Sequence, residues 1–495
     1  MEAISNFPSN PVKPHINPCR NYIFSRFPID SRSPNACRSF RFSNVNLSLN
    51  SVKKQRRPFP CSCNLSKTAS LDRETFDVVV VGAGIIGLTI ARQLLLGSDL
   101  SVAVVDAKMP CYGATGAGQG YIWMTHKTPG SDRWELSLRS KQLWGLLADS
   151  IQTQGMDPSQ VLGWKKTGSL LLGRTPDELA MLENRVKQLS EAGLRAEYLS
   201  AADLLSLEPA LEGGNVGGAA FLPDDCQLDA HRTVEFIEKG NKYFASHGRY
   251  AEFYHNPVIS LLRSAQNGEV EGVQTSKKIL YSKCALVIAA GAWSGSLMQS
   301  LVKDSDIVLD VPVKPRKGHL LVLENFNQFE LKHGLMEAGY ADHKIVKPLP
   351  SSASGVTEEE QTLTSISMTA TTDSMGNLVL GSSRQFTGFS TDVEESIINR
   401  IWERAGVFFP TLRELSLPNF VRSRKIRVGL RPYMIDGKPL IGPIPGIPKV
   451  FLATGHEGEG LCTALGTAEM IGDMILGNTG KVDWAPFSVQ GRCCT

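Results

Sequence analysis

The chain lacks the sequence features that mark membrane, metal and disulfide-rich proteins. None of its apolar runs approaches the roughly eighteen residues that a membrane-spanning helix needs. It has ten cysteines, but those beyond the N-terminal leader form no Cys-x-x-Cys pair and no spacing that suits zinc or an iron–sulfur cluster. We therefore expect no transmembrane segment, no metal site and reduced, non-catalytic thiols at Cys111, Cys226, Cys284, Cys462, Cys493 and Cys494.

A strong basic bias is also missing from most of the chain. The formal net charge is +3 over 495 residues, but residues 1–71 carry 11 Lys or Arg and only two acids. The remainder holds 41 basic and 47 acidic residues, a net charge of −6. Such a balance does not favour a nucleic-acid partner.

The leader, residues 1–71, is rich in Ser, Asn, Pro and Arg and has no apolar core of the length that a secretory signal needs. A basic cluster at 53–57 precedes Cys61-Ser62-Cys63. We predict a plastid transit peptide that does not contribute to the folded protein. A mitochondrial leader and a disordered basic tail of a cytosolic protein are the alternatives.

The most informative segment follows the leader and reads Asp77-Val78-Val79-Val80-Val81-Gly82-Ala83-Gly84-Ile85-Ile86-Gly87. Four valines before Gly-x-Gly-x-x-Gly predict a buried parallel strand that turns sharply into a helix at about 88–96, whose first amides can hold a pyrophosphate. In this pattern Gly82 allows the turn, Gly84 lets the backbone approach the phosphates, and Gly87 permits close helix packing. Asp106 ends the next predicted strand, at a spacing that suits the ribose hydroxyls of an adenosine.

Further along, a glycine-rich loop at 113–120 indicates close backbone contact with a ligand. The pattern then predicts a turn-rich connection at 213–220, a hairpin with its turn at 266–268, and a buried strand at 284–288 that returns to the first sheet. Alternating strands between about 305 and 415 predict an antiparallel sheet, with a mobile polar loop at 351–361. A short strand at 449–455 and a helix at 460–476 return to the nucleotide-binding pattern.

The fold class is therefore α/β, or α+β with two domains: a Rossmann-like nucleotide-binding domain assembled from discontinuous segments, with an inserted antiparallel substrate domain. The predicted bounds are 72–165, 220–300 and 420–485 for the nucleotide-binding domain, 166–219 and 301–419 for the substrate domain, and 486–495 for a C-terminal tail.

From Asp77 to about Gly477 the chain resembles the FAD-dependent D-amino acid oxidase and glycine oxidase family, including bacterial proline, hydroxyproline and opine dehydrogenase subunits. Two departures are visible: Asp106 stands where the family usually has Glu, and His319 where it usually has Gln. The segments that carry the resemblance are 82–87, Gly113-Ala114-Thr115-Gly116, Pro315-Arg316-Lys317-Gly318-His319, Gly429-Leu430-Arg431-Pro432 with Asp436-Gly437-Lys438-Pro439, and Gly455-His456-Glu457-Gly458-Glu459-Gly460-Leu461.

The resemblance implies FAD as cofactor, bound without a covalent link because no cysteine lies at 429–432, and it makes Cys462 a packing residue. Arg431 is predicted to bind the substrate carboxylate, with a structural ion pair as the alternative; Arg316 and Arg384 are expected to be solvent-facing or structural. No catalytic side chain is assigned. The predicted cofactor contacts are Gly82, Ala83, Gly84, Ile85, Ile86, Gly87, Asp106, Ala114, Thr115, Gly116, Val258, Ala290, Gly291, Gly455, His456, Glu457, Gly458, Gly460 and Leu461.

The expected activity is oxidation of the C–N bond of a small amino or imino acid, by hydride transfer to flavin N5. The sequence leaves open whether oxygen or a quinone reoxidises the flavin. Two alternatives also remain: a flavin oxidoreductase with a non-amine substrate, and a flavoprotein that acts as an assembly or scaffolding factor.

Overall fold

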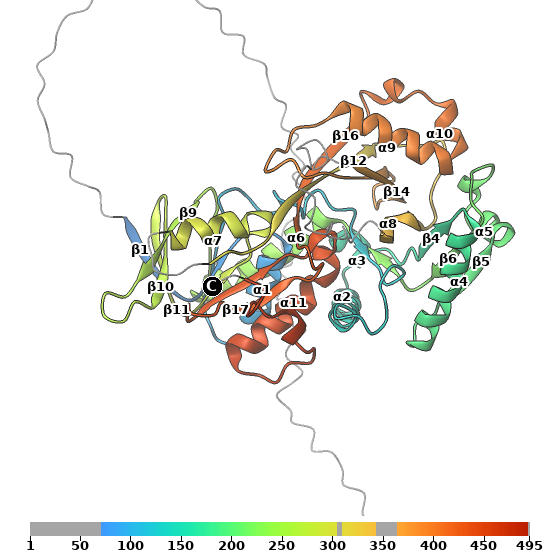
Figure 1. The fold of residues 1–495 in the computed structure, drawn as a ribbon. Helices are drawn as coiled ribbons and strands as arrows, with labels where there is room; N and C mark the ends of the chain where they lie inside the picture. The colour runs from blue at the N-terminus through green and yellow to red at the C-terminus, as the bar shows by residue number, and fades with distance from the viewer. Residues whose placement is uncertain (1–70, 304–308, 343–363, 494–495) are drawn as a thin grey trace, which may run out of the picture.

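The computed structural model describes residues 71–303, 309–342 and 364–493 (Figure 1). Residues 1–70 of the predicted leader and the whole predicted loop at 351–361 lie outside these residues. None of the helices in the described ranges is both long and apolar enough to cross a membrane.

The first sheet has a parallel core in the order β18-β11-β1-β2-β8, extended by antiparallel strands at its edges. The valines before the glycine turn form its central strand and are almost completely buried, because the sheet is covered on both faces. The strands are β1 (Asp72–Val81), β2 (Val102–Val105), β8 (Tyr250–Phe253), β9 (Val258–Arg263), β10 (Val270–Thr275), β11 (Lys278–Ile288), β17 (Leu440–Pro443) and β18 (Val450–Thr454).

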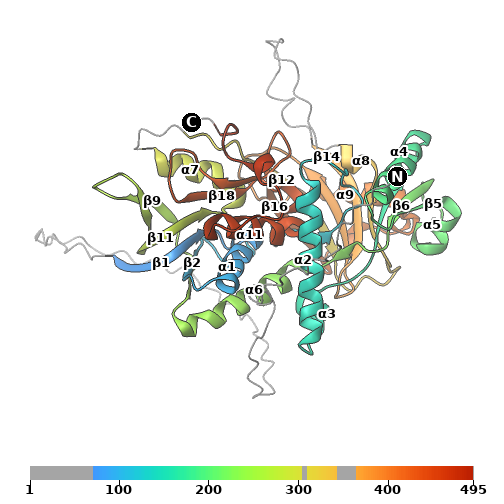
Figure 2. The same ribbon diagram turned by 90° about the horizontal axis from the view of Figure 1, so that it is seen from below.

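Alternate valines of β1 point into different cores. Val78 and Val80 belong to the cluster under α1, α2, α6 and α11, whereas Val79 and Val81 belong to the cluster under α7. In Figure 2 the long helix α2 lies between α11 and the second half of the molecule, and it packs on α11. These helices are α1 (Ile85–Gly97), α2 (Trp134–Thr153), α3 (Pro158–Leu162), α6 (Ala230–Lys242), α7 (Ser294–Val302) and α11 (Gly460–Leu476).

The second sheet runs β16-β12-β15-β14-β13-β4-β6-β5 and is antiparallel except for the pair β13–β4. Helices α9 (Glu395–Phe408) and α10 (Pro410–Glu414) bury its apolar face, and α4 (Pro176–Glu191), α5 (Ala201–Leu207) and the short α8 (Gly339–Asp342) lie nearby (Figure 1). Its strands are β4 (Ser169–Gly173), β5 (Glu197–Ser200), β6 (Gly218–Leu222), β12 (Lys314–Leu323), β13 (Gly334–Glu337), β14 (Ser365–Thr372), β15 (Leu378–Arg384) and β16 (Arg424–Tyr433). A separate pair joins β3 (Tyr121–Ile122) to β7 (Cys226–Gln227).

The α/β architecture, the hairpin around 266–268, the return of β11 to the first sheet and the antiparallel second sheet are confirmed. The turn-rich connection predicted at 213–220 is wrong at its end, where β6 pairs with both β4 and β5. Because the side chains at 218–220 are small, the sequence pattern there resembles a turn and did not indicate this buried strand. β16 pairs with β12 in the second sheet, although the predicted bound at 420 grouped its residues with the nucleotide-binding segments.

Candidate active site

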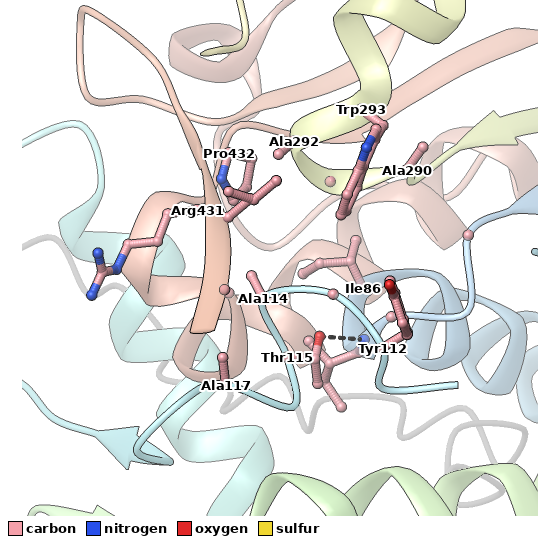
Figure 3. A pocket seen from close by; sticks show the side chains of 18 of the residues that line it. Ile86, Tyr112, Ala114, Thr115, Ala117, Ala290, Ala292, Trp293, Arg431 and Pro432 are labelled. Carbon is pink, nitrogen blue, oxygen red and sulfur yellow. Dashed lines mark hydrogen bonds between the residues drawn. The ribbon is translucent and has the colours of Figure 1, made fainter. Parts of the chain in front are cut away.

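A cavity of about 620 Å³ lies where the two sheets meet, at the carboxyl ends of β1, β2 and β18. This is the edge at which open parallel sheets bind ligands. The loop that contains Ala114, Thr115 and Ala117 forms one wall, Ala290, Ala292 and Trp293 form another, and Arg431 and Pro432 of β16 form a third (Figure 3). The cavity size is ordinary for a small-molecule or cofactor site.

The glycines of the first turn have the steric roles expected of them. Gly82 has a φ of +119°, and a Cβ there would lie 2.3 Å from the Ala289 oxygen. A Cβ at Gly87 would lie 2.0 Å from the Gly82 oxygen, so only glycine lets α1 pack this closely on the turn. A Cβ at Gly84 would meet nothing closer than the Thr115 hydroxyl, at 3.4 Å. Gly84 is therefore free of protein crowding on the side that faces the cavity.

Two polar side chains fix the loops around this turn. The Ile85 amide donates to Thr115 Oγ1 at 3.2 Å, the dashed line in Figure 3, which ties the start of α1 to the second glycine loop. Asp106, at the end of β2, lines the cavity and accepts from the amides of Ala83 and Lys108, both at 2.7 Å. Its carboxylate is thus held in place by backbone donors, and its contact with a ribose stays a prediction.

Most of the predicted cofactor residues lie together in the cavity wall, and four do not. Of those four, a Cβ at Gly116 would clash with the Cys111 oxygen at 2.3 Å, and Gly455 has a φ of +81°. These two, with Ala83 and Gly87, shape the turns behind the wall. The predicted residues that line the cavity are Gly82, Gly84, Ile85, Ile86, Asp106, Ala114, Thr115, Val258, Ala290, Gly291, Arg431, His456, Glu457, Gly458, Gly460 and Leu461.

Arg431 is mostly buried, with 14% of its side chain exposed, and its guanidinium points away from the side of the cavity formed by Trp293 and Ala290 (Figure 3). It crosses over Gly318, where a Cβ would lie 2.2 Å from Nη1, and donates to the Ser383 oxygen at 2.9 Å. Its Nε lies 3.9 Å from Glu457 Oε1. The guanidinium therefore sits at the end of the cavity that Gly318 and Glu457 line.

Glu457 also pairs with Arg316, and it adopts a φ of +50°, which is uncommon for a side chain of this size. Burial disfavours its charge, but Arg316, Arg431 and Arg384 outweigh that effect and lower the pKa of Glu457 to about 2. Glu457 is thus an ionised carboxylate at neutral pH. A group with so low a pKa is a poor general base.

The expectation that Arg316 and Arg384 are solvent-facing or merely structural is wrong in its first part. Arg316 and Arg384 are only 2% and 4% exposed. Arg316 packs 4.7 Å from the Tyr433 ring centroid, and Arg384 packs 4.0 Å from that of Tyr340. Arg316 lies on β12, which pairs with β16, and Arg384 lies on β15, which pairs with the other edge of β12; this strand order brings both charges to the same end of the cavity.

His456 and Cys462 follow the strand end and are both buried. The His456 Nε2 lies 3.0 Å from Thr467 Oγ1, and burial, only partly opposed by the charge of Glu459, lowers the pKa of His456 to about 4. Burial likewise raises the pKa of the Cys462 thiol, in keeping with a packing residue. At neutral pH the imidazole at this wall is therefore uncharged.

Several residues of the cavity wall were missed by sequence reasoning. Trp293 stacks on Phe389, with centroids 6.1 Å apart, and Tyr112 and Tyr340 contribute two more aromatic rings. Trp293 follows a recognisable strand end, a signal that was available. Tyr340 lies in the short helix α8 and Phe389 in an irregular segment, and no local pattern marks either as part of a site.

These features fit FAD. The start of α1 offers backbone amides and an open Gly84 to a pyrophosphate, Asp106 offers a carboxylate at the expected strand end, and the segment 454–461 offers a glycine-rich helix start beside apolar and aromatic walls. The residues that would hold the dinucleotide are thus present in one continuous cavity.

Comparison with known proteins gives a consistent result. The family described as FAD dependent oxidoreductase (DAO) matches residues 77–474. Glycine oxidase from Bacillus licheniformis is 26% identical over 416 residues, covering 83% of this chain and 96% of the relative. Hydrogen cyanide synthase subunit HcnC from Pseudomonas protegens is 24% identical over 445 residues, covering 83% and 95%.

Solved structures agree on the fold. Glycine oxidase from Geobacillus kaustophilus superposes with a TM-score of 0.67 at 20% identity, covering 84% of this chain and 99% of that one. L-proline dehydrogenase from P. horikoshii gives a TM-score of 0.67 at 19% identity, covering 84% and 97%. The family match spans most of the chain, including both halves of the cavity. The chain therefore belongs to the DAO family of FAD-dependent oxidoreductases.

Proposed function

We propose that this enzyme oxidises the C–N bond of a small amino or imino acid and holds the substrate carboxylate at Arg431. The observation that carries the proposal is the position of the Arg431 guanidinium, largely buried at the end of the cavity and fixed by the Ser383 oxygen and Glu457. A planar guanidinium held in this way offers paired donors to a carboxylate. Relatives named glycine oxidase and proline dehydrogenase support an amino acid as substrate.

FAD bound in this cavity would supply the two-electron chemistry, as the acceptor of a hydride at N5. The task of the chain is to orient the α C–H bond, with the carboxylate held at Arg431 and the aromatic wall around Trp293 and Tyr340 limiting the space available. As the hydride leaves, the nitrogen lone pair forms an iminium ion, and water then converts that product to a carbonyl compound and an amine.

No side chain of the cavity wall is needed as a base if the amine binds without its extra proton. Glu457 is too acidic, with a pKa of about 2, and His456 makes its hydrogen bond to Thr467 from a buried position. Catalysis then rests on orientation and on the cofactor. We propose further that the FAD dissociates on acid or heat precipitation, and that oxygen or a quinone serves as the electron acceptor.

The test is anaerobic bleaching of the flavin by glycine, sarcosine, the proline isomers and D-amino acids. Arg431→Ala should keep FAD but weaken reduction by roughly 2–5 kcal/mol, the usual cost of removing one partner of a buried charge pair. Arg431→Lys should recover only part, because an ammonium lacks the planar fork. The loss should shrink for a substrate whose carboxylate is replaced by an amide.

The matched control is Arg424→Ala, which removes an arginine from the same strand, where it pairs with the exposed Glu395. It should leave bleaching unchanged. An unchanged rate in Arg431→Ala would refute the carboxylate role. Absence of bleaching by every compound in the wild-type enzyme would instead favour a non-amine substrate or the assembly-factor alternative.

A further inference from the structure

Three arginines gather at one end of the cavity because three neighbouring strands of the second sheet each supply one. Arg316 on β12 lies directly opposite Arg431 on β16 in the antiparallel register. β12 also pairs with β15, and the bridge between Lys317 and Gln385 sets Arg384 beside the same stretch of β12. The sheet thus concentrates positive charge at one point.

Among the described residues this cluster has one carboxylate. Glu457 pairs with Arg316 and lies near Arg431, whereas Arg384 forms no ion pair with any residue of the ranges 71–303, 309–342 and 364–493. Arg384 donates from Nη2 to the Tyr340 oxygen at 3.3 Å, while its Nε and Nη1 are buried and have no hydrogen-bond partner. The Arg316 Nε is likewise buried and has no hydrogen-bond partner among the described residues. The cluster therefore carries two more positive than negative charges.

An excess of positive charge at a buried site is energetically unfavourable unless an anion neutralises it. Taking a guanidinium out of water without an acceptor for its N–H groups costs several kcal/mol by the usual order of magnitude. The excess also lies beside the cavity rather than in a closed core, because Arg431, Glu457 and Tyr340 all line the wall and Arg384 stacks directly on the Tyr340 ring. The wall is accordingly built to face an anion.

One carboxylate is not enough to balance this wall. A substrate with a single carboxylate, held at Arg431, would leave one uncompensated positive charge in the cluster. A substrate with two acidic groups would leave none. Arg384 is 4% exposed and does not line the cavity itself, so it would act on the second group mainly through its charge, across Tyr340.

We propose that the preferred substrate carries a second acidic group, so that the enzyme acts on acidic amino or imino acids rather than on neutral ones. This inference rests on the proposed function. It makes Arg384 a residue that sets specificity between acidic and neutral substrates, whereas Arg431 would serve both classes.

The first experiment compares acids with their amides in the FAD-loaded full chain. Glutamate against glutamine and aspartate against asparagine, in both D and L forms, differ only in the second acidic group. Anaerobic flavin reduction should favour the acid of at least one pair by about tenfold to a hundredfold in the ratio of rate to dissociation constant, the range of one charge–charge interaction across an aromatic ring in a partly buried site. Equal reduction by acid and amide in every pair overturns the inference.

Arg384→Gln should reduce that preference to within a few-fold while keeping FAD and the reaction with the amide. Because both substrates meet the same flavin, a change in its reduction potential cancels from the ratio. Arg424→Gln is the control, since it removes an arginine of the second sheet away from the cavity wall, and it should leave the preference unchanged. A preference that survives in Arg384→Gln contradicts the role given to Arg384.

A second measurement does not depend on turnover or on the variant. The wild-type flavin spectrum is titrated with succinate against succinamate and with glutarate against glutaramate, which cannot be oxidised at a C–N bond. The diacid of at least one pair should bind about tenfold or more tightly than its monoamide. Equal binding in both pairs refutes the inference even if amino acids bleach the flavin. Tight diacid binding without bleaching by any amine would leave the anionic site standing and contradict the proposed function instead.

Discussion

The imidazole of His456 provides a pH-dependent test of how the cavity wall is built. The side chain is 5% exposed, with Nε2 3.0 Å from Thr467 Oγ1, and its pKa is lowered to about 4 by burial, against the smaller opposite effect of Glu459. We choose His456→Gln, because an amide can keep a hydrogen bond to Thr467 but cannot take up a proton in this pH range.

The direction in which stability changes with pH follows from which state, folded or unfolded, binds the proton more readily. A histidine in the unfolded chain has a pKa of about 6.5. Between about pH 6.5 and pH 4, His456 is therefore protonated in the unfolded chain but neutral in the folded protein. Stability from the buried neutral ring is therefore fully present above about pH 6.5 and is lost as the pH falls towards 4. A difference of about 2.5 pKa units at 1.36 kcal/mol each gives a loss of about 3 kcal/mol.

The assay is equilibrium urea unfolding of the FAD-loaded full chain, wild type and His456→Gln, at several pH values between about 7 and about 4.5. Other titrating groups are common to both proteins and cancel in the difference. The wild type should lose stability relative to the variant as the pH falls, approaching about 3 kcal/mol at the acid end. Histidine ring NMR should show one resonance, missing in the variant, that does not titrate above about pH 5. Parallel stability curves, or a midpoint near 6.5 for that resonance, would refute the reasoning.

The remaining predictions concern the cofactor and the leader. Gly84→Val should abolish the yellow colour of the purified protein but keep its circular dichroism, because a Cβ there meets nothing nearer than 3.4 Å and would instead fill the space of the pyrophosphate. Gly97→Ala, whose Cβ would meet nothing within 4 Å, is the control and should stay yellow. Gly87→Ala should destabilise the fold itself, since its Cβ would lie 2.0 Å from a backbone oxygen, and a stable yellow variant would show that the packing argument is wrong. We also propose that residues 1–71 direct a fluorescent reporter into plastids; mitochondrial or cytosolic fluorescence would contradict this.

The nucleotide-binding half was predictable because its signals are local. A run of four valines, a glycine triplet and an acid at the next strand end lie within about thirty residues, the scale of one βαβ unit. The reasons for Gly82 and Gly87 can be stated from the spacing, and the structure shows the close contacts that require them. The last strand and helix were found for the same reason, with β18 and α11 close to their expected bounds.

The second sheet was harder to predict because its register depends on segments far apart in the chain. β12 pairs with β16, more than one hundred residues later, and only that pairing sets Arg316 opposite Arg431. A charged residue in a strand pattern is ordinarily taken as solvent-facing. The alternation of Arg316 with Gly318 was the one available signal, because a glycine two residues along the same face leaves room for a long side chain from the next strand.

The two halves of the cavity differ in how freely a single side chain can be exchanged. The glycine turn and Asp106 serve a cofactor that the whole family shares, and their geometry comes from backbone conformation, which tolerates little change. The arginines come from three strands whose pairing fixes only the backbone, so exchanging one side chain alters the charge of the wall without altering the fold. Of the three, Arg316 is tied to Glu457 and Arg431 to the Ser383 oxygen, while Arg384 keeps two buried nitrogens without partners. In the role that we propose for it, Arg384 is therefore the position at which an exchange would alter the preference for acidic substrates most independently of the shared chemistry.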